Sequence, residues 1–143
     1  MKALVIGYGS IGKRHCEVLE TLAQIDEICL VTSQDVVGKV CYKSLEEILN
    51  LDKFDYFVIA TPTFLHLENL KFIDERVSGK IILCEKPLFE KKYKFTPKNN
   101  KIFVGYVLRF HPLLQKLKEF LKKEKILYLN ANCGQYLPSW RSG

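Results

Sequence analysis

Short apolar runs alternate along the chain with longer stretches in which apolar residues recur every three or four positions. The first run, residues 2–6 (KALVI), ends in Gly7, and a helical pattern follows it to about residue 23. A second run, residues 27–32 (EICLVT), completes a strand–helix–strand unit of the expected length. Because parallel strands need such a crossover connection, the pattern predicts a parallel sheet with both faces buried.

The same alternation continues through the rest of the chain. Further strands are predicted at residues 56–60, 80–84, 102–107 and 126–133, and a loop at residues 89–101. Helices are predicted from a capping box at Ser44 and Glu47 to about Asn50, from a cap at Thr63 to the region before Gly79, and from Pro112 to about Lys125. This order of elements predicts an α/β protein with a doubly wound, mostly parallel sheet.

Composition and charge narrow the function classes. The chain has 143 residues, of which 48% are apolar and 27% charged, as expected for one globular domain. The net charge of +6 is local, because residues 86–125 carry twelve basic and three acidic side chains. These lysines flank an amphipathic helix and fill one loop, without a nucleic-acid motif, so a solvated face is expected and not a nucleic-acid site.

The apolar runs and the cysteines indicate the environment of the chain. No apolar run approaches the ~20 residues of a membrane helix, so neither a membrane span nor a signal peptide is expected. The five cysteines are odd in number and lie at least 12 positions apart. This spacing fits neither a disulfide framework nor a zinc site, so we expect a reducing, cytoplasmic compartment and no bound metal.

A glycine motif follows the first strand and opens the first helix. Its three glycines, Gly7, Gly9 and Gly12, would respectively allow a tight turn, a close approach to a pyrophosphate and close helix packing. The backbone N–H groups at Ser10 and Ile11 would then face the phosphates at the positive end of the helix dipole. This context predicts a dinucleotide site, and the alternative is a glycine-rich turn with a structural role only.

The end of the second strand should distinguish NAD from NADP. An acidic residue there accepts hydrogen bonds from the ribose hydroxyls, whereas a small or basic residue accommodates a 2′-phosphate. The chain has Thr32, Ser33 and Gln34 at this point, and Asp35 comes slightly late. Ser33 is the candidate contact, and the cofactor is NAD or NADP.

Several motifs occur together in one order: residues 7–15 (GYGSIGKRH), 60–63 (ATPT) with His66, 85–88 (EKPL), 106–112 (YVLRFHP) and 136–141 (YLPSWR). In these motifs the sequence resembles the Gfo/Idh/MocA oxidoreductases, the glucose-fructose oxidoreductase and inositol dehydrogenase family. The resemblance implies a Rossmann domain followed by a second α/β domain. It also implies NAD(P)-dependent chemistry on sugars, sugar nucleotides or polyols.

The resemblance also assigns roles to particular residues. Lys86 matches the active-site lysine, whose ammonium would hydrogen-bond the substrate hydroxyl and stabilise the oxygen on which charge develops. The Lys86–Pro87 peptide is expected to be cis. The remaining cofactor-binding candidates are Arg14, Thr61, Pro62, Glu85, Arg109, Trp140 and Arg141, whereas His15 and His66 are expected to pack or cap.

The resemblance implies a domain plan as well. Residues 1–125 would form the NAD(P)-binding domain, and residues 126–143 would begin the crossover into a second domain that lies beyond this chain. The family's catalytic Asp/His pair would lie there too, so the chain is expected to be inactive alone. Its partner would be a carbohydrate-like small molecule, and the full-length form is compatible with a homo-oligomer. The alternative is a nucleotide-binding regulatory module without catalysis.

Overall fold

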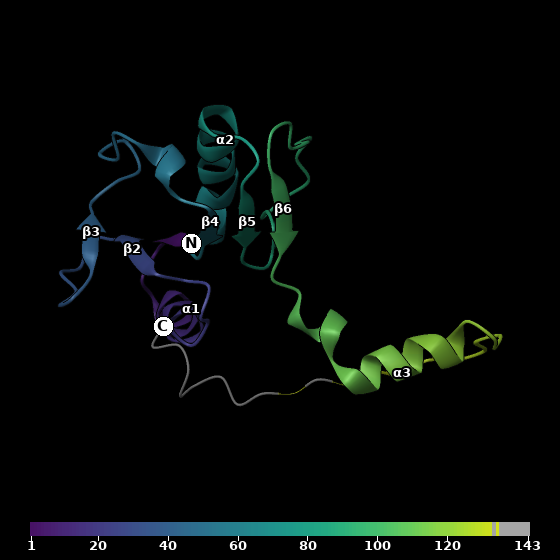
Figure 1. Cartoon of the computed structure of the whole chain (residues 1–143). Coiled ribbons are helices and arrows are strands. Elements are labelled where there is room, and N and C mark those ends of the chain that lie inside the picture. Colours follow the sequence, from purple (N-terminus) through teal and green to yellow (C-terminus); the bar gives the residue numbers. More distant parts are fainter. Residues whose placement is uncertain (133, 135–143) are drawn as a thin grey trace. The chain divides into compact units, whose positions relative to one another are not determined.

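Six parallel strands form the sheet of this chain, whose computed structural model describes residues 1–132 and 134. The strands are β1 (Lys2–Ile6), β2 (Glu27–Val31), β3 (Val40–Tyr42), β4 (Tyr56–Ile59), β5 (Ile81–Cys84) and β6 (Lys101–Val104). They lie in the order β3-β2-β1-β4-β5-β6, which can be followed in Figure 1. The order reverses between β1 and β4, and this switch point is where doubly wound sheets bind ligands.

The central strands β1, β2 and β4 are buried on both faces of the sheet, and alternate side chains of each strand point to opposite faces. On one face Ala3 and Val5 of β1 pack with Cys16 and Leu19 of α1 (Ser10–Glu20). On the other face Leu4 and Ile6 belong to the cluster that contains Leu70 and Ile73 of α2 (His66–Arg76). The predicted doubly wound α/β architecture is therefore confirmed.

The chain divides into two compact units, Met1–Tyr106 and Val107–Gly143. The first contains the whole sheet with α1 and α2, and the second contains α3 (Pro112–Leu121) after a 3₁₀ turn at Val107–Phe110. Pro112 occupies the first turn of α3 as predicted. The predicted domain boundary between residues 125 and 126 stays a prediction.

The region after β2 differs from the sequence prediction. No helix forms over residues 44–50; the Glu47 carboxylate accepts a hydrogen bond of 2.7 Å from the backbone N–H of Lys43, and a 3₁₀ turn follows at Leu51–Lys53. The short strand β3 was not predicted, because three residues carry too little periodicity. Thr63 begins a 3₁₀ turn and does not cap α2, which begins at His66.

The strand predicted at residues 126–133 is also wrong over its described part, because residues 126–132 form no strand. Leu127 and Tyr128 are 89% and 82% exposed. A strand exists only where a neighbour supplies hydrogen bonds, and an apolar run alone does not provide that neighbour. In the described part of the chain, no helix has the length and apolarity that crossing a membrane requires.

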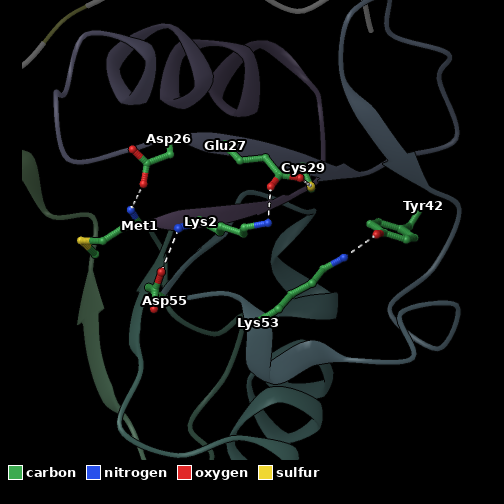
Figure 2. Close-up of polar contacts among 8 residues, drawn as sticks. All are labelled: Met1, Lys2, Asp26, Glu27, Cys29, Tyr42, Lys53 and Asp55. Carbon is green, nitrogen blue, oxygen red and sulfur yellow. Dashed lines mark hydrogen bonds and ion pairs between the residues drawn. The ribbon is translucent and has the colours of Figure 1, made fainter.

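Polar contacts gather where β1 and β2 begin (Figure 2). The Met1 ammonium pairs with the Asp26 carboxylate, and the Lys2 ammonium lies 2.6 Å from the Glu27 carboxylate. The backbone N–H of Lys2 donates to the Asp55 carboxylate at 2.8 Å, which connects β1 to the segment before β4. Lys2 and Glu27 are partners in the strand register, so these contacts support the alignment of β1 with β2.

Candidate functional site

A groove of about 660 Å³ lies at the carboxyl ends of the strands on both sides of the switch point. Its volume is within the range of small-molecule and cofactor sites. Seven predicted cofactor-binding residues line it: Gly7, Gly9, Ser10, Ile11, Ser33, Thr61 and Pro62. The groove therefore brings together the ends of β1, β2 and β4.

The first glycine of the motif makes the turn at the end of β1. Gly7 has a φ of +93°, which side chains rarely permit, and its N–H donates to the Val31 carbonyl of β2 at 2.9 Å. A Cβ atom on Gly7 would lie 2.7 Å from the Ala60 carbonyl oxygen. A Cβ on Gly12 would lie 2.1 Å from the Gly7 carbonyl oxygen. Both glycines thus allow backbone segments to pack directly against each other.

The middle glycine has a different environment. Gly9 precedes α1 with a φ of −75°, and a Cβ there would meet no described heavy atom within 4 Å. Among the described residues, no side chain caps α1 and its first turn has no acidic residue. The N–H groups of that turn and the helix dipole therefore face open space in the groove. An anion such as a phosphate fits this arrangement.

The β2 side of the groove is polar. The Thr32 hydroxyl accepts a hydrogen bond from the N–H of Gln34, whose side-chain amide donates to the Tyr8 carbonyl at 3.1 Å. Lys43, which follows β3, donates to the Ser33 carbonyl at 3.2 Å and pairs with Asp35 at 2.8 Å. The contact with Asp35 raises the pKa of Lys43, and the contact with Lys43 lowers the pKa of Asp35.

The turn after β4 is held in place by α2. The Asn69 side chain donates to the Thr61 hydroxyl at 3.1 Å, and Nε2 of His66 lies 2.9 Å from the Thr61 carbonyl oxygen. Nδ1 of His66 lies 3.1 Å from the Pro87 carbonyl and 3.2 Å from the Leu88 carbonyl. With 1% of its surface exposed, His66 connects two turns of the backbone, as its predicted packing role requires.

The end of β5 combines a buried acid with an exposed lysine. Glu85 is 8% exposed, and its carboxylate lies 2.8 Å from Nε2 of His15 in α1. A Cβ on Gly105 would lie 3.1 Å from a Glu85 oxygen, so a glycine leaves room for this carboxylate. Lys86 is exposed, and its peptide bond to Pro87 is cis as predicted. Neither Glu85 nor Lys86 lines the groove described above.

The other predicted site residues are distributed differently. Arg14 is exposed on α1, pairs with Glu17 at 2.9 Å and does not line the groove. Arg109 belongs to the 3₁₀ turn of the second unit. Trp140 and Arg141 lie outside the described residues. The roles of all four remain predictions.

Lys43 and Glu46 are among the groove residues that sequence reasoning missed. Both follow β3, and the pairing of β3 with β2 brings Lys43 to the Ser33 carbonyl. A polar segment directly after a short β-rich run (VCY) was the available signal. This polar segment reaches the groove only because the run VCY pairs with β2 as a strand.

Comparison with known proteins gives a consistent result. Residues 1–94 match the Gfo/Idh/MocA family, described as an oxidoreductase family with an NAD-binding Rossmann fold. An inositol 2-dehydrogenase from Pseudarthrobacter chlorophenolicus is 28% identical over 145 residues, and one from an Arthrobacter species is 27% identical over 144. Each match covers 88% of this chain, which spans 42% of each relative.

Solved structures show the same fold. Apo scyllo-inositol dehydrogenase from Lactobacillus casei has a TM-score of 0.69 at 16% identity. The WlbA dehydrogenase from Bordetella pertussis, solved with NADH and UDP-GlcNAcA, has a TM-score of 0.66 at 20% identity. Each comparison covers 85% of this chain and 41% of the solved chain.

Proposed function

Because the chain belongs to the Gfo/Idh/MocA oxidoreductases and carries their NAD-binding Rossmann domain, we propose that its groove binds a nicotinamide dinucleotide for hydride transfer to or from a polyol or sugar-like substrate. The open space at Gly9, beside the N-terminus of α1, carries this proposal. A pyrophosphate needs a close approach to helix N–H groups, and a side chain at this position would prevent that approach.

The residues of the groove fit the cofactor. The N–H groups at the start of α1 would hold the pyrophosphate, Ser33 would contact the adenosine ribose, and the turn at Thr61 would lie along the cofactor. When bound, the nicotinamide supplies the hydride acceptor or donor. Lys86 would donate a hydrogen bond to the substrate oxygen, where a positive ammonium stabilises developing negative charge.

The relatives support a proposal for the substrate class. Two proteins that share more than a quarter of their aligned residues with this chain are inositol 2-dehydrogenases. A cyclic polyol presents several hydroxyl groups to hydrogen-bond donors, and the exposed ammonium of Lys86 is such a donor. We therefore propose a polyol or a related carbohydrate as the substrate of the protein to which this domain contributes.

Calorimetric titration of the chain with NADH and NADPH tests the cofactor site. Gly9→Val should abolish binding of both dinucleotides, because its side chain would occupy the space for the phosphates, and Gly9→Ala should weaken binding less. The ordinary backbone angles at Gly9 permit both substitutions without strain. Thr21→Val, at the opposite end of α1, is the matched control and should bind like the parent.

Circular dichroism should show that all three variants are folded. If folded Gly9→Val binds NADH and NADPH as tightly as the parent, the pyrophosphate lies elsewhere and the proposed site is wrong.

A further inference from the structure

A lysine ammonium is fixed beside the end of β2, where dinucleotide sites contact the adenosine ribose. Lys43 Nζ donates to the Ser33 carbonyl and to the Asp35 carboxylate, and Lys43 and Ser33 both line the groove. Two hydrogen bonds hold this position: the N–H of Thr32 donates to the Tyr42 carbonyl at 2.9 Å, and the backbone N–H of Lys43 donates to the Glu47 carboxylate. The ammonium is therefore attached to a defined point of the sheet.

The acidic groups near the ribose position differ in their environment. Asp35 is 97% exposed, does not line the groove and already pairs with Lys43. Glu46 lines the groove, and a hydrogen bond from Ser44 lowers the pKa of its carboxyl. Glu68 lines the groove from α2. The segment directly after β2, residues 32–34, has only neutral side chains, and the ammonium of Lys43 is hydrogen-bonded to its backbone at Ser33.

The ion pair between Lys43 and Asp35 is weak enough for another anion to replace the Asp35 carboxylate. Both side chains are more than half exposed, and such surface ion pairs contribute little net stability. A phosphate monoester carries more charge than a carboxylate and offers three acceptor oxygens. A 2′-phosphate at the ribose position would therefore replace Asp35 as the partner of the Lys43 ammonium at small cost.

We propose, on the basis of the proposed dinucleotide site, that Lys43 is the residue that determines cofactor specificity and that its ammonium binds the 2′-phosphate of NADP(H). In this arrangement Ser33 orients the ammonium through its carbonyl oxygen, and Asp35 occupies the ammonium in the free protein. The domain consequently prefers NADP(H) to NAD(H).

Binding of two probe pairs isolates the 2′-phosphate. Calorimetry should give tighter binding of NADPH than of NADH, and of 2′,5′-ADP than of 5′-AMP. Lys43→Ala should weaken NADPH and 2′,5′-ADP roughly tenfold or more, the loss expected for one charge-assisted hydrogen bond. It should change NADH and 5′-AMP less than twofold, because neither carries the extra phosphate.

Three further variants make the test specific. Lys39→Ala is the matched control, because Lys39 precedes β3 as Lys43 follows it and also pairs with a carboxylate, that of Glu20, at 2.5 Å. It should leave all four ligands unchanged. Asp35→Asn should strengthen NADPH binding severalfold, since it removes the competing carboxylate. Glu46→Gln tests the opposite arrangement, in which Glu46 accepts the ribose hydroxyls of NAD(H).

The outcomes are distinct. Equal weakening of NADH and NADPH by Lys43→Ala would reduce Lys43 to a structural role and overturn the inference. A preference for NADH that Glu46→Gln removes would overturn it as well. Failure of the folded parent chain to bind any of the four ligands would instead contradict the proposed function.

Discussion

Asp74, near the C-terminal end of α2, is a buried carboxylate that organises the segment before β6. It accepts hydrogen bonds from the backbone N–H groups of Lys98 and Asn99 at 2.9 and 3.2 Å, and from the Asn100 side chain at 3.0 Å. Asn100 also donates to the Val77 carbonyl at 2.8 Å. Burial alone would raise the pKa of Asp74, but these hydrogen bonds outweigh it and lower the pKa.

This lowered pKa predicts how stability depends on pH. Because the folded chain holds the ionised carboxylate more strongly than the unfolded chain does, Asp74 stabilises the fold above pH ~4. That contribution should be lost as the pH falls from ~4 through the lower pKa of the folded state. Asp74→Ala should reduce the free energy of unfolding at pH 7 by about 3 kcal/mol, because charged hydrogen bonds are lost.

Urea unfolding between pH 7 and pH 3, followed by circular dichroism, measures this effect. The exposed Asp52 provides the control, and Asp52→Ala should cost little at any pH. A parent chain and an Asp74→Ala chain with the same pH dependence below pH 4 would contradict the assignment.

At the scale of the elements, His66 connects the turn after β4 with the turn after β5. Its ring contacts the carbonyl of Thr61 after β4 and those of Pro87 and Leu88 after β5. The carboxyl ends of two neighbouring strands are thereby fixed to each other and to the beginning of α2. The groove residue Thr61 and the exposed Lys86 thus belong to one connected frame.

Removing this imidazole should loosen both turns. His66→Ala removes the contacts of the buried ring with the backbone and opens a cavity, so the free energy of unfolding should fall by about 2–4 kcal/mol. Affinity for NADH should fall as well, because the Thr61 turn lines the groove. Denaturant unfolding and calorimetry check the two effects, with the exposed His111 as control. Equal stability of His66→Ala and His111→Ala would contradict this role.

The elements that sequence reasoning located are those whose signal is local. Strands β1, β2, β4, β5 and β6 appear as short runs dominated by apolar residues, and the φ of Gly7 matches the tight turn expected of the first glycine. The other elements depend on partners far along the chain. The three residues of β3 form a strand because β2 lies beside them, whereas residues 126–132 form none although they begin with the apolar run ILYL. Lys43 was missed for the same reason, because strand pairing brings it to Ser33.

At the scale of the whole molecule, we expect the chain to bind the cofactor without turning over a substrate. Two histidines of the first unit are already engaged: His15 contacts Glu85, and His66 contacts backbone carbonyls. The Lys86 ammonium donates hydrogen bonds and does not accept a proton. Oxidation of a hydroxyl also needs a base and a positioned substrate, so the chain should bind cofactor without oxidising polyols.

Two measurements check this expectation. NADH or NADPH at 100 times its dissociation constant should stabilise the fold by about 2.7 kcal/mol, visible as a higher midpoint of thermal unfolding. The absorbance of reduced nicotinamide should stay constant with inositols, sugars and sugar nucleotides. Saturable turnover by this 143-residue chain, abolished by Lys86→Ala, would show that the domain is catalytically self-sufficient.

The polar contacts at the beginning of β1 and β2 have a consequence for protein engineering. Lys2 and Glu27 pair at one end of these strands, while the groove opens at the other, and a five-residue strand separates the ends by roughly 15 Å. Substitutions that far apart without shared partners usually have additive effects. The amino ends of the strands can therefore be varied to increase stability, and the carboxyl ends can be varied to change ligand specificity. Each end can be screened in its own library of variants.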